Sequence, residues 1–184
     1  FVWGELCDWY IELAKPHLHQ SVELDAAKAA RRHIVQGVLA SALETTMRLL
    51  HPFAPFVTEE IWQILPKPPQ LPGSLMITVF PRADQQWIDK AAEAEMQLIQ
   101  DAIGGCRMLR QTYGLPPAQQ IAVELRISND AKRDTITRFQ DFFSRMARVT
   151  ATITAGGAPV PGAAKTIVGS DIEVVMPLGG LIDV

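Results

Sequence analysis

The chain has 184 residues, of which 48% are hydrophobic and 20% are charged, and its formal net charge is −3. This length allows one domain, or one domain with a small appendage, and the composition predicts a packed core. It excludes a globally basic nucleic-acid binder, and the absence of any apolar run of roughly 18–20 residues excludes a membrane-spanning helix, so any contact with RNA must come from a local cluster of Lys and Arg.

Three helices are predicted before the first proline-rich segment. Apolar residues at three- and four-residue steps predict a helix over residues 1–18. Asp25 is the predicted N-cap of a long second helix, which should end near Leu50 because the prolines that follow remove amide donors. The third helix is predicted over about 56–65. The apolar stripe predicted for the second helix consists of Ile34, Val38, Ala42, Thr45 and Leu49, with Val35, Leu39 and Leu43 beside it.

A fourth helix is predicted after the proline-rich segment 66–74, which we expect to be a loop followed by a short extended stretch over 75–80. Asp84 is its predicted N-cap, and the helix should run to about Tyr113. Gly104-Gly105 interrupts it at a cost of about 1 kcal/mol per glycine relative to alanine. This pair predicts a kink or a close contact of the helix.

Beyond residue 117 the pattern changes to a small α/β appendage. Its predicted elements are a strand over 121–127, a helix from Asn129 or Asp130 to about Met146, and strands over 149–154, 166–168 and 172–176. We therefore predict a mainly α fold. An antiparallel helical bundle occupies 1–117, and a βαβββ subdomain occupies 118–184.

Two groups of basic residues are candidate RNA contacts. Arg107 and Arg110 lie three apart near a predicted helix end, where they either stabilise that end or form a paired contact with RNA. Lys28, Arg31 and Arg32 lie in the first turns of the second helix. Cations there oppose the helix macrodipole, which is explained either by a partner anion or by exposure together with the Asp25 cap.

The wider region from 107 to 148 contains eight Lys and Arg against four acids, an excess of four. Within it, a run of alternating charges predicts a salt-bridged, exposed helix face. Its members are Asp134, Arg138, Asp141 and Arg145.

Aromatic and histidine residues offer weaker signals. Most of the helical aromatics, among them Trp9 and Trp62, are expected in the core. We expect core burial for Phe1 and Trp3 as well, and these two are the candidates for stacking on RNA bases if they are exposed instead. His17 and His19 lie two apart, but no Cys or acidic cluster completes a zinc set, so no metal site is predicted. No catalytic constellation stands out.

The two cysteines lie far apart in apolar helical patterns, which favours a reducing compartment, and no signal peptide is visible. We expect a cytoplasmic monomer with no membrane contact. Both ends read as cut, which indicates a fragment of a longer chain.

Two long segments resemble the valyl-tRNA synthetases: FVWGELCDWYIELAKP (1–16) and LLHPFAPFVTEEIWQ (49–63). The second is typical of the anticodon-binding helical bundle of class I synthetases for aliphatic amino acids, and the residues 7–12 favour the valyl member. Arg107-x-x-Arg110 running into Leu115-Pro116-Pro117 is similar to a helix end of the family. The final segment 179–183 resembles the junction before its C-terminal coiled-coil arm.

The resemblance implies a parent enzyme that joins valine to its tRNA with ATP and Mg²⁺. The family's ATP-binding signatures do not occur here, so the fragment should recognise the tRNA anticodon, bind no cofactor and be inactive alone. Its implied partners are valine tRNA and the rest of the synthetase chain. Two alternatives stay open: the same region of an isoleucyl- or leucyl-tRNA synthetase, and a helical protein-interaction module without an RNA role.

Overall fold

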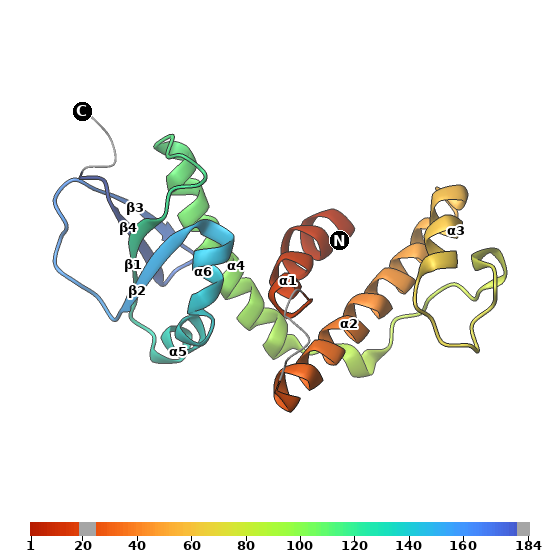
Figure 1. The fold of residues 1–184 in the computed structure, drawn as a ribbon. Helices are drawn as coiled ribbons and strands as arrows, with labels where there is room; N and C mark the ends of the chain where they lie inside the picture. The colour runs from red at the N-terminus through yellow and green to blue at the C-terminus, as the bar shows by residue number, and fades with distance from the viewer. Residues whose placement is uncertain (19–24, 180–184) are drawn as a thin grey trace. The chain divides into compact units, whose positions relative to one another are not determined.

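The computed structural model describes residues 1–18 and 25–179 (Figure 1). The chain forms two compact units, Phe1–Gln85 and Gln86–Val184, and each is described by itself. The N-terminal unit contains η1 (Val2–Ile11), α1 (Glu12–Leu18), α2 (Ala26–Leu50), α3 (Pro55–Ile64) and η2 (Leu75–Ile77). The C-terminal unit contains α4 (Lys90–Thr112), β1 (Ile121–Ile127), α5 (Asp130–Arg138), α6 (Gln140–Ala147), β2 (Val149–Thr154), β3 (Ala163–Val168) and β4 (Ile172–Pro177), and η3 (Gln85–Trp87) lies at the boundary.

Helices followed by a small mixed sheet confirm the predicted fold class. The two compact units divide the chain after Gln85, whereas the predicted domain boundary lies at 117. Helix α4 belongs to the C-terminal unit because it contacts β3, β4, α5 and α6. A domain over 1–117 stays a prediction. Among the described residues, no helix is both long and apolar enough to cross a bilayer.

The helices of the N-terminal unit begin and end at local signals. The first opens as a π-helix, in which the carbonyl of Phe1 accepts hydrogen bonds from both Glu5 N (2.8 Å) and Leu6 N (3.2 Å). The predicted cap of α2 is confirmed, since the carboxylate of Asp25 accepts a hydrogen bond from Lys28 N at 2.8 Å. Pro55 opens α3, as suits a residue without an amide donor.

The segment from His51 to Leu75 contributes two residues to a core cluster of this unit. Trp62 is fully buried with Met47 and Leu75, and its indole donates to the carbonyl of Pro72 at 3.2 Å. Thr58 lies 2.8 Å from His51 Nδ1. Polar side chains of this segment therefore stabilise the turn between α2 and α3 and the loop that follows α3.

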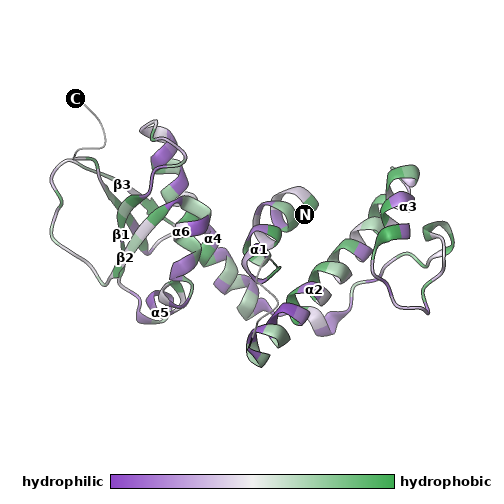
Figure 2. Ribbon diagram, viewed as in Figure 1, coloured by the Kyte–Doolittle hydropathy of each residue, from purple (hydrophilic) through white to green (hydrophobic). Residues whose placement is uncertain are grey.

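The predicted stripe on α2 is wrong. Ile34, Val38 and Leu49 are 59%, 48% and 40% exposed, whereas Val35 and Met47 are buried. Within the N-terminal unit the helices α1 and α3 cover α2 over parts of its length, so an apolar pattern does not by itself define a buried face. Figure 2 shows hydrophobic residues in green along α2 and α3.

The C-terminal unit is a four-stranded mixed sheet in the order β2-β1-β4-β3. β1 pairs in parallel with β2 and antiparallel with β4, while β3 and β4 form a hairpin. Helices α4, α5 and α6 pack on one face (Figure 1). Alternate residues of β1 on that face, such as Val123 and Leu125, are almost completely buried.

Gly105 lies where α4 approaches the sheet most closely. A methyl group added at Gly105 would come within 2.5 Å of Cγ2 of Val168 and 3.2 Å of Cγ2 of Val174, whereas one added at Gly104 would meet nothing within 4 Å. The helix runs through both glycines without a break. Of the two predicted consequences of this pair, the close contact is the one observed.

Three predicted elements differ from the structure. The stretch 75–80 contains the short 3₁₀ turn η2 rather than an extended segment, because Ser74 caps it by accepting a hydrogen bond from Met76 N. Helix α4 begins at Lys90 rather than after Asp84, because Asp89 accepts hydrogen bonds from the next amides. The single helix predicted to end near Met146 is two helices, because the backbone leaves the helical region at Phe139.

Cys106 gives the first prediction. It is free and fully buried, and burial raises the pKa of its thiol to about 12, with the positive charge of Arg110 acting weakly in the opposite direction. Because the thiolate is the reactive form, we expect iodoacetamide at pH 8 to leave Cys106 unmodified in the folded chain and to alkylate it in denaturant. Peptide mass spectrometry measures this, and rapid labelling of the native chain would show that the site opens.

Candidate nucleic-acid interface

Half of the eight basic residues between 107 and 148 are paired with carboxylates. Arg126 contacts Glu124 at 2.8 Å and Glu173 at 3.3 Å. Lys132 pairs with Asp171, Arg133 with Asp130, and Arg138 with Glu95. These four therefore offer little net charge to an RNA, and the local excess seen in the sequence resides elsewhere.

The four residues of the predicted helix face are exposed as expected, but the predicted salt bridges along it are wrong. Within the described residues, no ion pair joins Asp134 to Arg138 or Asp141 to Arg145, and Arg138 instead reaches Glu95 of α4 at 3.4 Å. The break at Phe139 disrupts the spacing of three and four residues that such a face requires.

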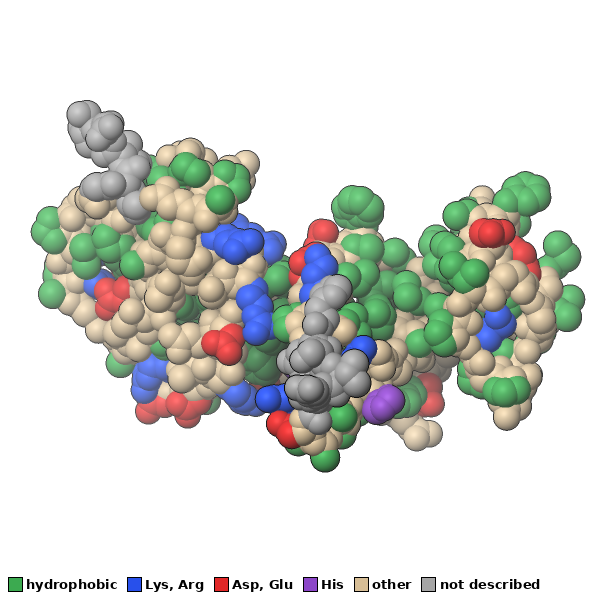
Figure 3. Space-filling view, viewed as in Figure 1, with side chains coloured by type: hydrophobic (Ala, Val, Ile, Leu, Met, Phe, Trp, Pro, Cys, Tyr) green, Lys and Arg blue, Asp and Glu red, His purple; other side chains and the backbone are tan. Residues whose placement is uncertain are grey.

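The remaining positive charge gathers where α4 and α6 end. An open depression of about 470 Å³ lies there, lined by Arg107, Arg110, Gln111, Gly114, Leu115, Pro117, Met146, Ala147 and Arg148. Among these described residues none is acidic. Figure 3 shows Lys and Arg side chains gathered over α4 and α6 in this part of the C-terminal unit. We call this feature the arginine depression.

Arg107 and Arg110 are brought together as the spacing predicts, but in different environments. Arg107 is exposed, and its Nε donates to the carbonyl of Met146 at 2.8 Å. Arg110 is only 7% exposed and donates to the carbonyls of Gln119 (2.7 Å), Arg148 (3.1 Å) and Pro116 (2.5 Å). Its acceptors are neutral, so the charge of Arg110 is not cancelled by them.

Arg148 is the residue that sequence reasoning missed as a site. It ends α6 in the left-handed conformation (φ 53°, ψ 45°), and among the described residues it alone has a positive φ without being glycine. Burial lowers the pKa of Arg110, and the charge of Arg148 lowers it further. The sequence signal that could have identified Arg148 is an arginine directly after a helix, at the position where glycine is usual.

The second predicted group lies on α2, in the N-terminal unit. Lys28 is exposed and pairs with Asp25 at 3.4 Å, while Arg31 is exposed and Arg32 is half-buried. The hydrogen bond from Lys28 N lowers the pKa of Asp25. The cap therefore offsets part of the unfavourable interaction of these cations with the helix start. A role of the three in RNA binding stays a prediction.

Phe1 and Trp3 are 79% and 80% exposed, so the expectation that these two are buried in the core is wrong. Both lie at the start of η1, and their use in base stacking stays a prediction. Trp62, by contrast, is in the core as expected.

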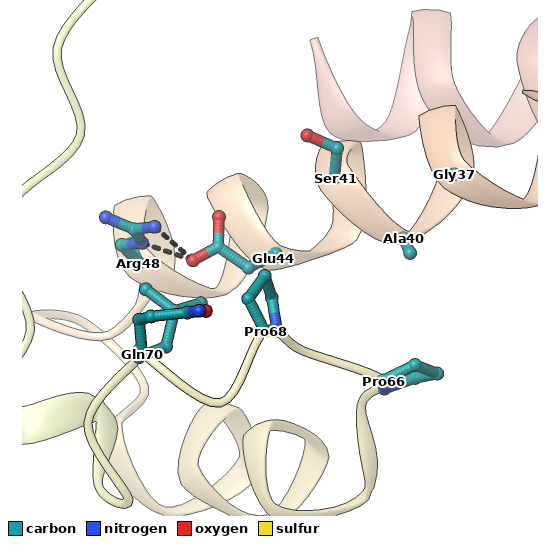
Figure 4. Close-up of a pocket in the computed structure, with 9 residues that line it drawn as sticks. Gly37, Ala40, Ser41, Glu44, Arg48, Pro66, Pro68 and Gln70 are labelled. Atoms are coloured by element: carbon teal, nitrogen blue, oxygen red, sulfur yellow. Dashed lines mark hydrogen bonds and ion pairs between the residues drawn. The ribbon is translucent and has the colours of Figure 1, made fainter.

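A second hollow lies between α2 and the proline-rich loop of the N-terminal unit (Figure 4). Its charged residues are Glu44 and Arg48, which pair with each other, and Arg48 also donates to the carbonyl of Val79 at 3.2 Å. Arg48 therefore connects α2 to the stretch that follows the loop. His19 lies outside the described residues, and among the residues that are described no group of three or more His, Cys, Asp or Glu could hold a metal ion.

Comparison with known proteins decides the family. The model of the anticodon-binding domain of tRNA ligase matches residues 1–125. The chain belongs to this family. The matched region 1–125 includes Arg107 and Arg110 but ends before Arg148. The arginine depression therefore extends beyond the matched region.

Curated relatives match the anticodon-binding region 1–125 and also the rest of this chain. The valine–tRNA ligases of Desulfotalea psychrophila, Acinetobacter baylyi and Geobacillus kaustophilus are 39%, 37% and 36% identical to the chain and cover all of it. The chain spans 20%, 18% and 20% of their respective lengths. The resemblance to valyl-tRNA synthetases is confirmed. The segment 180–183, which resembles a junction to an arm, lies outside the described residues.

Proposed function

We propose that this chain is the tRNA-recognising segment of a valine–tRNA ligase. In this proposal the complete enzyme, a cytoplasmic monomer, ligates valine to its tRNA with ATP and Mg²⁺. This segment binds the anticodon part of the tRNA and has no catalytic role of its own. The observation that carries the proposal is the match of the whole chain to valine–tRNA ligases, together with the anticodon-binding match over 1–125.

The chemistry of the arginine depression supports an RNA partner. Arginine binds phosphate through planar, charge-assisted hydrogen bonds, and a local cluster suffices although the whole chain is acidic. Lys28, Arg31 and Arg32 are the second candidate contact. Phosphate contacts set the register of the RNA, and splayed bases supply the sequence information.

A separate recognition surface is reasonable for such an enzyme. A pocket that selects among aliphatic amino acids discriminates weakly, by about 1–3 kcal/mol for one methylene. Selection of the tRNA is independent of that pocket. It can therefore reside in a segment without catalytic residues.

Aminoacylation by the full-length enzyme tests the assignment. We expect charging of valine tRNA with valine and no comparable charging with isoleucine or leucine. Specific charging with either of those would assign the segment to another synthetase. Equal, salt-independent binding of valine tRNA and an unrelated RNA would favour a protein-interaction module instead.

The contact itself is tested by Arg107→Ala. Loss of one charge-assisted hydrogen bond to phosphate should raise the KM for tRNA about tenfold and leave valine-dependent ATP–pyrophosphate exchange unchanged. The matched control is Lys90→Ala, which removes one cation from the other end of the same helix, about 25 Å away. Equal KM values for both variants and the wild type would remove Arg107 from the interface.

A further inference from the structure

The arginine depression joins two parts of the chain that are distant in sequence. Arg107 and Arg110 come from α4, and Arg148 comes from the end of α6, 38 residues beyond Arg110. Hydrogen bonds connect the two sides: Arg107 to the carbonyl of Met146, and Arg110 to the carbonyl of Arg148. The anticodon-binding match ends at 125, so one side of the depression is formed by residues outside it.

Arg110 acts inward, on the backbone. It is almost completely buried, and three of its N–H groups point at carbonyls of Pro116, Gln119 and Arg148. The Arg148 carbonyl also accepts a hydrogen bond from Ile121 N at 3.1 Å. Two donors from different elements therefore fix the peptide group of Arg148.

Arg148 is held in an unfavourable state on two counts. A left-handed conformation costs a residue with a side chain roughly 1–2 kcal/mol, which glycine avoids. Its guanidinium also lies near another cation, and within the described residues no carboxylate pairs with it. Backbone strain of this kind concentrates at ligand-binding positions. An anion in the depression would relieve the repulsion.

We propose that Arg148 is a direct contact to a phosphate of the tRNA backbone, next to Arg107, and that Arg110 is the positioning residue that holds Arg148 in place. This inference rests on the proposed function. A phosphate fits better than a base because no aromatic side chain is among the described lining residues, so stacking is not supported there. The contact adds affinity and register, and it carries no sequence information.

Arg148→Gly in the full-length enzyme is the sharpest test. Glycine keeps the left-handed backbone and removes the side chain with its cation. We expect the KM for tRNA to rise about tenfold and the slope of log affinity against log salt to decrease by about one. The midpoint of thermal unfolding should stay the same or rise, and ATP–pyrophosphate exchange should not change. Arg148→Lys, which retains the charge, should recover part of the affinity.

A double-mutant cycle tests the role of Arg110. Arg110→Lys cannot reach three carbonyls, so it should raise the KM for tRNA severalfold when Arg148 is present. It should add little in the Arg148→Gly background, where no side chain remains to be positioned. Equal effects of Arg110→Lys in both backgrounds would overturn the positioning role.

Three results separate the inference from the proposed function. If the enzyme charges valine tRNA normally and Arg148→Gly leaves both KM and salt slope at their wild-type values, the phosphate contact is wrong while the function stands. A lower unfolding midpoint with an unchanged KM also overturns it, because Arg148 would then act in folding alone. If the wild-type enzyme does not charge valine tRNA, the proposed function itself fails.

Discussion

Replacing Arg110 with methionine is expected to lower the free energy of unfolding of the C-terminal unit by about 3 kcal/mol. The side chain is 7% exposed and donates to three backbone carbonyls. Methionine fills the space of the aliphatic stem but removes three hydrogen bonds from a charged donor, each worth about 1–3 kcal/mol. The carbonyls of Arg148 and Pro116 each keep a second donor, from Ile121 N and Gln119 N, while the Gln119 carbonyl loses the donor it has from Arg110. Water reaches part of this open edge, so the sum stays at the lower end.

Amide hydrogen exchange measures this effect within the unit itself. Protection of the Val123 and Leu125 amides, which lie in the central strand β1, should fall about a hundredfold, the equivalent of roughly 3 kcal/mol. Arg145→Met is the matched control. Arg145 is exposed on α6 and lines no part of the depression, so protection should change little. Similar losses for both variants would mean that the hydrogen bonds of Arg110 contribute nothing specific.

The neighbouring glycines of α4 should respond in opposite directions to the same substitution. Gly105→Ala places a methyl group 2.5 Å from Val168 Cγ2, and we expect it to lower the free energy of unfolding by about 2 kcal/mol. Gly104→Ala enters open space and should raise it by up to about 1 kcal/mol, because alanine is the better helix former. Propensity is the same in both, so the difference reports the contact with the sheet.

Urea unfolding of both variants measures the difference, and a rescue identifies its cause. Val168→Ala removes the methyl group that Gly105→Ala would strike, so the double variant should be more stable than the sum of the two single effects predicts. Equal stabilities of the two single alanine variants would show that α4 can move away from the sheet at no cost.

Local signals allowed much of the fold to be predicted. Asp25 and the prolines after Leu50 define α2, and β-branched runs define β1 and β2 at the residues observed. The N-cap of α4 was misplaced because Asp84 and Asp89 are equivalent in sequence, and only the intervening turn η3 distinguishes them. The prediction of the α2 stripe was wrong for a different reason. The burial of a helix face depends on which elements pack against it, and the periodicity of apolar residues does not identify those elements.

The candidate site was predictable only in part. The three-residue spacing of Arg107 and Arg110 places both at the end of α4, as observed. Sequence gave no reason to distinguish an exposed arginine from a buried one, since that difference arises from carbonyls of the following loop and of α6. Arg148 reaches them because the end of α6 contacts α4, and no local sequence pattern covers the separation of 38 residues between Arg110 and Arg148.

The strand order has a consequence for the synthesis of the chain. The two inner strands, β1 and β4, are the first and last of the C-terminal unit, and they pair residue by residue from Glu124 with Val175 to Ile127 with Ile172. A ribosome must therefore deliver nearly the whole unit before β1 gains its second neighbour. The N-terminal unit closes within its own first 85 residues and can fold while the rest is still being translated.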